Sequence, residues 1–282
     1  MAVKNNNLID KTEAKYLLLY LLKQFKMVCQ KAGITYYASG GTCLGAVRHK
    51  GIIPWDDDID VMMPRKYYDR FVEACGEILP DTVVICTREN DPYFCGEYIK
   101  LCYRDDVKTF SDLSIDVFFL DDTNPQRKIF RAIQNRLLLD LYFIKTYKVS
   151  RMGKGPYYVP RNFFRRCQVA LFGCMSIRFI DKIHKRIMTA EKAETAYWVN
   201  WGACYSYKKA TYNKAALGVP KEVPFENTTI SLAADPEEIL LHLYGPSYMT
   251  PPPPEKRTDH GVAPFKCAAL DMDKIKQEIG EL

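Results

Sequence analysis

The residues best suited to chemistry are two aspartates, Asp58 and Asp60, in the segment Trp55-Asp56-Asp57-Asp58-Ile59-Asp60. On a strand, alternate side chains share a face, so both carboxylates are expected on one side, while Ile59 and its neighbour Val61 point into the core. Two carboxylates on one face suit a hard cation such as Mg²⁺, which takes oxygen ligands and keeps contact with substrate phosphates; Mn²⁺ is the alternative. The pair therefore predicts a metal site for a phosphate-bearing substrate.

A third carboxylate is expected from a neighbouring strand. Asp116 lies within the apolar segment 114–120, and a charge embedded in an apolar strand needs a partner. Asp58, Asp60 and Asp116 are therefore the candidate metal ligands and catalytic residues. The alternative is a solvated acidic loop, the common fate of charge runs, but β-forming residues flank the acidic run.

The second candidate feature is Gly40-Gly41, which follows a short strand-like segment and is expected to form a tight turn before a helix that begins at Thr42. Glycines let a backbone approach a ligand without obstruction by a Cβ atom. Free N–H groups at a turn or helix start also favour phosphate oxygens. Gly40, Gly41 and Thr42 are therefore candidates for binding phosphate.

Basic side chains near these motifs are further candidates. Arg48, His49 and Lys50 stand just before the acidic turn, where they either contact phosphates or pair with Asp56 and Asp57. Asp57 is accordingly counted with the substrate-binding residues. An alternative role for it is to close the turn without touching metal.

Lys100 and Arg104 belong to an expected strand between the two aspartate motifs and are also candidates for phosphate contacts. The alternative for this pair is a solvated strand edge, where lysine and arginine are common.

Length and composition indicate the domain organisation and the cellular location. The 282 residues, 48% of them apolar, suffice for a core domain with an appendage. No run of about 18 uncharged apolar residues occurs and the N-terminal segment is polar, which predicts a cytoplasmic protein. Ten scattered cysteines without a C-x-x-C pair favour reduced residues in the core over a zinc site.

The net charge of +6 hides a basic middle, since residues 124–192 hold 16 Lys+Arg and 3 Asp+Glu. Such a segment attracts phosphate-rich partners. One interpretation is a set of helices in peripheral contact with the inner face of a membrane. The other is a helical appendage whose apolar faces are buried.

Periodicity and turn residues predict a mixed sheet flanked by helices, an α+β fold with a basic helical appendage. The change in character at Asn124-Pro125 predicts a catalytic core at 1–123, a basic helical region at 124–200 and a C-terminal segment at 201–282. The expected helices are 8–32, 42–48, 65–78 and 236–243, and the expected strands are 34–39, 58–63, 82–87, 98–103 and 114–120.

The run from Gly40 to Asp60 resembles the signature of the LicD family, to which fukutin and the fukutin-related protein are also related. A second resemblance is C-terminal: Leu243-Tyr244-Gly245, then Tyr248-Met249 and Pro253-Pro254-Glu255-Lys256-Arg257 with His260, is similar to the family's tyrosine, glycine, proline and basic pattern. This resemblance adds Lys256, Arg257 and His260 to the candidate substrate-binding residues and implies that the C-terminal segment returns to the active site.

The resemblance implies a nucleotidyltransferase-like fold and transfer of a phosphorylated alcohol from a CDP-alcohol donor to a glycan. Phosphocholine from CDP-choline is expected, with a cell-surface glycan or its lipid-linked oligosaccharide precursor as acceptor. In this interpretation Gly40, Gly41 and Thr42 hold the donor phosphates. Ribitol phosphate from CDP-ribitol, and transfer of a nucleotide from an NTP, are the enzymatic alternatives. A nucleic-acid-binding protein that uses the basic middle is the non-enzymatic alternative, and no nucleic-acid partner is expected.

Overall fold

The computed structural model describes residues 10–91, 94, 96–104, 110–127, 163, 166–167, 170–171, 174–191, 193–257 and 270–280. The chain divides into two compact units. The first contains residues 1–86, 98–120 and 212–282, and the second contains residues 87–97 and 121–211. The expected division into 1–123, 124–200 and 201–282 stays a prediction.

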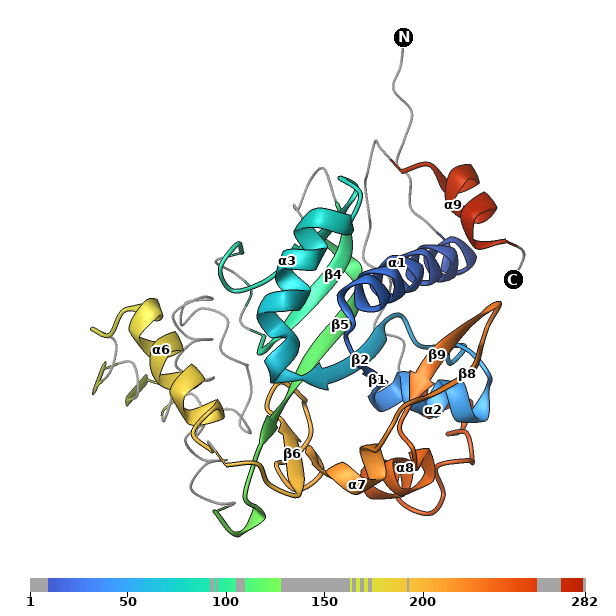
Figure 1. Cartoon of the computed structure of the whole chain (residues 1–282). Coiled ribbons are helices and arrows are strands. Elements are labelled where there is room, and N and C mark those ends of the chain that lie inside the picture. The colour runs from blue at the N-terminus through green and yellow to red at the C-terminus, as the bar shows by residue number, and fades with distance from the viewer. Residues whose placement is uncertain are drawn as a thin grey trace. The chain divides into compact units, whose positions relative to one another are not determined.

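The first unit is built on a mixed sheet with strand order β1-β2-β5-β4-β3 (Figure 1). β2 and β5 are parallel, whereas β4 runs antiparallel to both β5 and β3. These strands are β1 (Tyr37–Ala38), β2 (Ile59–Pro64), β3 (Val83–Cys86), β4 (Tyr98–Arg104) and β5 (Phe110–Asp122). The α+β fold class expected from the sequence is thus confirmed.

Helices α1 and α3 lie across this sheet and pack against each other (Figure 1). α1 spans Lys11–Ala32, and Asp10 and Glu13 form a capping box at its start. Its core side, which includes Leu17 and Phe25, is fully buried. The expected helix at 65–78 begins as a 3₁₀ turn, η1 (Arg65–Tyr67), before α3 (Tyr68–Ile78).

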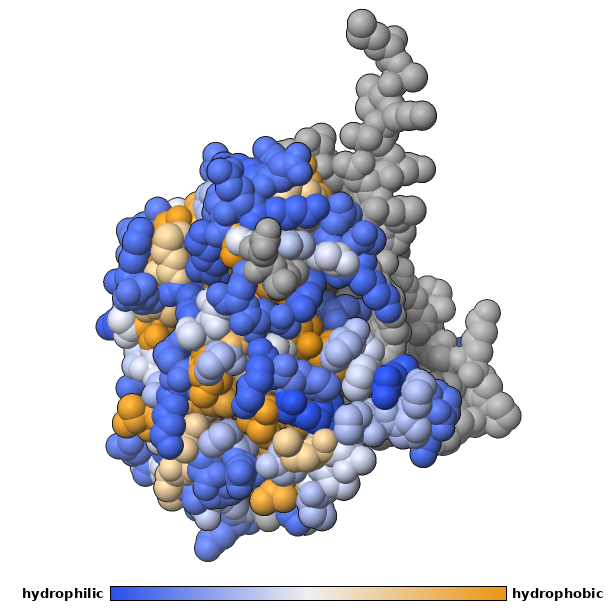
Figure 2. Space-filling model, turned by 90° about the vertical axis from the view of Figure 1, so that its right-hand side faces the viewer, coloured by the Kyte–Doolittle hydropathy of each residue, from blue (hydrophilic) through white to orange (hydrophobic). Residues whose placement is uncertain are grey.

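Short elements complete the first unit. They are α2 (Gly40–Arg48), α7 (Lys214–Leu217), the hairpin β8 (Lys221–Phe225) and β9 (Thr228–Leu232), α8 (Pro236–Tyr244), η5 (Pro254–Lys256) and α9 (Met272–Ile279). α2 packs against β2 and α8, so a helix far along the chain supports the glycine-rich one. On the face in Figure 2, hydrophobic residues form small patches scattered among hydrophilic ones.

The expected turn at Gly40-Gly41 is wrong in one respect, because both glycines lie inside α2. The change of direction takes place at Gly40 alone, whose φ of 49° is left-handed and needs glycine. The helix therefore starts two residues earlier than Thr42.

The second unit contains η2 (Pro125–Arg127), α6 (Ile177–Met188) and β6 (Tyr197–Asn200), and β7 (Thr211–Asn213) begins at its last residue. One side of α6 is buried, with Ile180, His184 and Met188 at fourfold spacing. Ile180 and Met188 are therefore packed within the protein, whereas Phe179 of the same helix is exposed, and both interpretations of the basic middle stay predictions. A membrane contact elsewhere in 124–192 stays a prediction.

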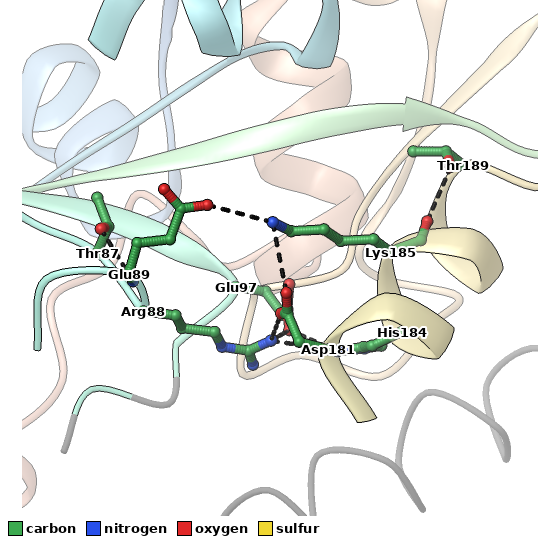
Figure 3. Close-up of polar contacts among 8 residues, drawn as sticks. All are labelled: Thr87, Arg88, Glu89, Glu97, Asp181, His184, Lys185 and Thr189. Atoms are coloured by element: carbon green, nitrogen blue, oxygen red, sulfur yellow. Dashed lines mark hydrogen bonds and ion pairs between the residues drawn. The ribbon is translucent and has the colours of Figure 1, made fainter. Parts of the chain in front are cut away.

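A polar cluster joins α6 to the segment 87–97 (Figure 3). The buried Glu97 carboxylate contacts the Arg88 guanidinium and Nδ1 of His184. Arg88 also lies 3.3 Å from Asp181. Charged groups at this depth are tolerated only when paired, so the cluster fixes the position of α6 in its unit.

Two expectations about composition can be compared with the described residues. Two described cysteines, Cys174 and Cys204, are exposed, contrary to the expectation. Those buried as expected are Cys29, Cys43, Cys75, Cys86 and Cys102. Among the described helices, none combines the length and apolar character needed to cross a membrane.

Candidate active site

The centre of the site is a row of three side chains across neighbouring strands. Asp60 on β2 is the register partner of Asp116 on β5, and Asp116 is the partner of Lys100 on β4. Residues in register on adjacent strands project from the same face of a sheet. Two carboxylates and an ammonium are therefore lined up across β2, β5 and β4.

Asp58 completes an acidic cluster immediately before β2. Carboxylate oxygens of Asp58, Asp60 and Asp116 lie within 4.8 Å of one another. Asp58 and Asp60 are half-buried, Asp116 is buried, and Ile59 between the first two is fully buried in the core. The structure thus brings together the three aspartates that the sequence singles out.

The electrostatics show how closely these charges are packed. Burial, followed by the charges of Asp56 and Asp116, raises the pKa of Asp58 to about 7. Burial and the neighbouring Asp58 and Asp116 also hold the pKa of Asp60 well above its usual value. Both shifts mean that the ionised forms lack sufficient positive charge nearby.

Lys100 supplies part of that charge. Its Nζ lies 3.2 Å from Oδ1 of Asp116 and donates a hydrogen bond of 3.0 Å to Oγ of Ser114. Burial lowers the pKa of Lys100, but Asp116 more than offsets this and the net pKa is raised. Because β4 has a neighbouring strand on both sides, the alternative of a solvated strand edge is wrong for Lys100.

Ser114 is a site residue that the sequence analysis missed. Its hydroxyl donates a 2.7 Å hydrogen bond to Oδ1 of Asp116, and it is fully buried. The available signal was the spacing, since residues 114 and 116 share a face of the same strand.

The start of α2 is tied to Asp60 by the backbone. The N–H of Asp60 donates to the buried Thr42 hydroxyl at 2.8 Å, and the N–H of Ser39 donates to the Asp60 carbonyl at 2.9 Å. A Cβ atom on Gly41 would lie 2.7 Å from Oδ2 of Asp56. Gly41 therefore leaves room for a carboxylate of the acidic run, and the proposed phosphate contact of Gly40, Gly41 and Thr42 stays a prediction.

Three basic side chains lie around the ring of Trp55, a residue that the sequence analysis did not single out as functional. The Arg257 guanidinium lies 4.4 Å from the ring centroid and Arg48 lies at 6.0 Å, while the His49 ring meets it edge-on at 5.9 Å. Arg48 also donates to the carbonyl of Tyr248 at 2.9 Å. The C-terminal segment thus lies against the first motif.

Positive charge and burial lower the pKa values of two residues in this basic group. Burial, then Arg48 and Arg257, lowers the pKa of His49, so it is neutral near pH 7. Burial also lowers the pKa of Arg48. The expected pairing of these basic residues with Asp57 does not occur, because the Asp57 carboxylate forms no hydrogen bond or ion pair with any described residue.

Four other candidates are not part of these contacts. Lys50 is exposed at a left-handed φ of 59°, and its carbonyl accepts the N–H of Glu226. Arg104 is exposed at the end of β4, four residues and thus about 13 Å along the strand from Lys100. Lys256 is exposed in η5, and His260 lies outside the described residues.

The aspartates fit a hard divalent cation. They provide only oxygen ligands, they converge on one point, and their raised pKa values show that a positive charge there would relieve repulsion. The overlapping group Asp56, Asp57 and Asp58 also has carboxylate oxygens within 4.8 Å of each other.

Comparison with known proteins agrees with this geometry. Residues 33–126, which include β2, β4, β5 and the whole acidic cluster, match the family model described as LicD/FKTN/FKRP, nucleotidyltransferase domain. This segment is similar to the LicD-family domain. The nucleotidyltransferase-like core expected from the sequence is thereby confirmed.

Curated relatives of the LicD-family domain include two kinds of transferase. The chain is 51% identical over 130 residues to the lipopolysaccharide cholinephosphotransferase LicD of Haemophilus influenzae, a match that covers 44% of this chain and 49% of that protein. It is 53% identical over 34 residues to the human ribitol 5-phosphate transferase FKRP, covering 12% of this chain and 7% of the relative. The chain thus spans about half the length of LicD and a small part of FKRP.

Proposed function

We propose that the protein transfers phosphocholine from CDP-choline to a hydroxyl of a cell-surface glycan or of its lipid-linked precursor, with release of CMP. The convergence of Asp58, Asp60 and Asp116 inside a LicD-family domain is the observation that carries the proposal. The similarity to a cholinephosphotransferase supports phosphocholine as the transferred group.

The carboxylates define where the reaction takes place. Asp58, Asp60 and Asp116 would hold Mg²⁺, or Mn²⁺ in its place, and such an ion neutralises charge on the donor diphosphate. Thr42 fixes the backbone of Asp60, and Ser114 and Lys100 fix the carboxylate of Asp116. The catalytic groups are thus held before substrate binds, which lowers the cost of orientation.

The transfer is a displacement at phosphorus. The acceptor oxygen forms a new bond to the choline-bearing phosphorus, the bond from that phosphorus to the bridging oxygen breaks, and CMP departs with the electron pair. Asp116 is our candidate to take the hydroxyl proton, because Ser114 and Lys100 engage its Oδ1 and leave Oδ2 for this role. Lys100, Arg48 and Arg257 supply positive charge for the phosphates.

The test is a CMP-release assay with purified protein, Mg²⁺, CDP-choline and a cell-envelope glycan extract. Asp58→Asn and Asp60→Asn should lower release by more than about 100-fold, since they remove proposed metal ligands. Asp81→Asn, an exposed aspartate in the turn before β3, is the matched control and should behave as wild type.

Ribitol phosphate is the second candidate, favoured by the similarity to the ribitol 5-phosphate transferase. Release of CMP from CDP-ribitol but not from CDP-choline would keep the site and replace the transferred group. Release of pyrophosphate from an NTP would overturn the proposed reaction.

A further inference from the structure

A pocket of about 400 Å³ lies in the first unit beside the acidic cluster. The start of α1 forms one wall and the segment 52–57 forms the other. The lining residues on these two segments are Lys11, Thr12, Ala14, Lys15, Leu18, Ile52, Ile53, Pro54, Trp55, Asp56 and Asp57. The pocket is thus mostly apolar, with an aromatic ring and two carboxylates next to the residues proposed for catalysis.

Asp57 is the acidic group available to a ligand. Its carboxylate is half-buried and takes part in no hydrogen bond or ion pair within the described residues. The other carboxylate in the wall, Asp56, lies close to Gly41. A half-buried carboxylate beside apolar walls favours a positively charged occupant, because burial without a partner is costly.

The two lysines in the wall do not cancel this preference. Nζ of Lys15 lies 2.7 Å from the carboxylate of Glu226, so its charge is already paired. Lys11 is exposed at the first turn of α1, where water screens its charge.

Trp55 adds a second attraction for a cation. Its ring lines the pocket, and two cations, Arg257 at 4.4 Å and Arg48 at 6.0 Å from the ring centroid, already contact part of its π surface. Indole is the aromatic group that attracts cations most strongly, and aromatic walls recognise quaternary ammonium ligands.

We propose that this pocket binds the cationic end of the donor's alcohol, a quaternary ammonium group such as that of choline. The inference rests on the proposed function for its donor, and it assigns the choice of alcohol to Asp57, Trp55 and the apolar wall formed by Leu18 and Ile53. Because Asp57 and Asp58 belong to one group of carboxylates, an alcohol in the pocket would be joined directly to a phosphate at the catalytic aspartates.

The test compares ligands that differ only at the alcohol. Isothermal titration calorimetry should show tighter binding of CDP-choline than of CDP-glycerol to the full chain. Choline alone should likewise bind more tightly than its neutral isostere 3,3-dimethylbutanol, by about tenfold, the scale of a partly desolvated cation–π and carboxylate contact.

Two variants separate the contribution of the Asp57 charge to binding from that of the open space in the pocket. Asp57→Asn should weaken CDP-choline binding by about tenfold and reduce the preference over CDP-glycerol. Thr12→Trp, at an exposed position of the pocket wall, should fill the pocket and have a similar effect, whereas Gln30→Trp on the exposed surface of α1 is the control.

Equal weakening of CDP-choline, CDP-glycerol and CMP by Thr12→Trp would overturn the proposal and place the nucleoside in the pocket. Unchanged binding of all three ligands by both variants would also overturn it. A choline preference without CMP release in the transfer assay would leave the pocket standing and remove the proposed reaction, so the two failures are distinguishable.

Discussion

Lys100 and Asp116 are register partners on the antiparallel strands β4 and β5, and their charged groups lie 3.2 Å apart. Asp116 is in turn the partner of Asp60 on β2, so one lysine faces a cluster of carboxylates across the sheet. The same contact thus stabilises the fold and sets the charge of the site.

Replacing this lysine should destabilise the protein through the aspartates. Lys100→Met is expected to lower the free energy of unfolding by about 1–3 kcal/mol without divalent cation, because a buried carboxylate loses its partner. Urea denaturation measures this loss. Asp116→Asn in the same chain should recover part of it, and additive losses in the double variant would show that the two groups are not coupled.

Divalent cation should stabilise the protein more at high pH than at low pH. The pKa of Asp58 is about 7 in the folded chain against an ordinary 3.8, so folding favours its protonated form. Its ionisation therefore costs stability increasingly as pH rises from about 4 to about 7. Above that range a bound cation relieves the full repulsion, whereas at about pH 5 protons compete with it.

Thermal denaturation with and without Mg²⁺, at about pH 5 and about pH 8, measures this difference. The increase in Tm should be larger at the higher pH and should shrink in Asp58→Asn. An equal increase at both values would contradict cation binding at these carboxylates.

Thr42→Val should damage both stability and activity. The buried Thr42 hydroxyl accepts the N–H of Asp60, and valine would leave that amide without its acceptor at a cost of about 1–3 kcal/mol. The CMP-release rate should fall as well, since Asp60 loses an anchor. Thr42→Ser keeps the hydroxyl and should retain most of both properties; equal losses in the two variants would show that the hydroxyl is not the group responsible.

Two glycines in helices offer a matched pair of substitutions. An alanine Cβ at Gly41 would lie 2.7 Å from Oδ2 of Asp56, whereas one at Gly76 in α3 would have no atom within 4 Å. Gly41→Ala should therefore displace Asp56 and reduce CMP release several-fold. Gly76→Ala should keep full activity and raise stability by up to about 1 kcal/mol through helix propensity. Full activity in Gly41→Ala would show that the position of Asp56 is not critical.

The stability of the polar cluster in the second unit should depend on the buried carboxylate of Glu97. Glu97→Gln removes the charge that Arg88 and His184 contact and should cost about 3–5 kcal/mol, measured by denaturant unfolding. Glu89→Gln changes an exposed glutamate 3.4 Å from Lys185 and should cost less than about 1 kcal/mol. Similar small losses in both variants would indicate that α6 is held by its apolar contacts alone.

The sequence by itself determined the local parts of this protein. Strand periodicity put Asp58 and Asp60 on one face, and the apolar flanks of Asp116 marked a buried strand, because both patterns depend on neighbours in the chain. The spacing of apolar residues in α1 likewise located that helix to within three residues. At Gly40 the local rule was insufficient, since a single left-handed residue replaced the expected two-residue turn.

Only the tertiary structure decided which of these parts meet. Strand order and register, which place Asp60 and Lys100 on either side of Asp116, depend on pairing between segments far apart in the chain. The approach of Arg257 to Trp55, and the pocket between α1 and Asp57, arise in the same way. The physical reason is that packing of the whole core selects these distant contacts, and no periodicity within one segment encodes them.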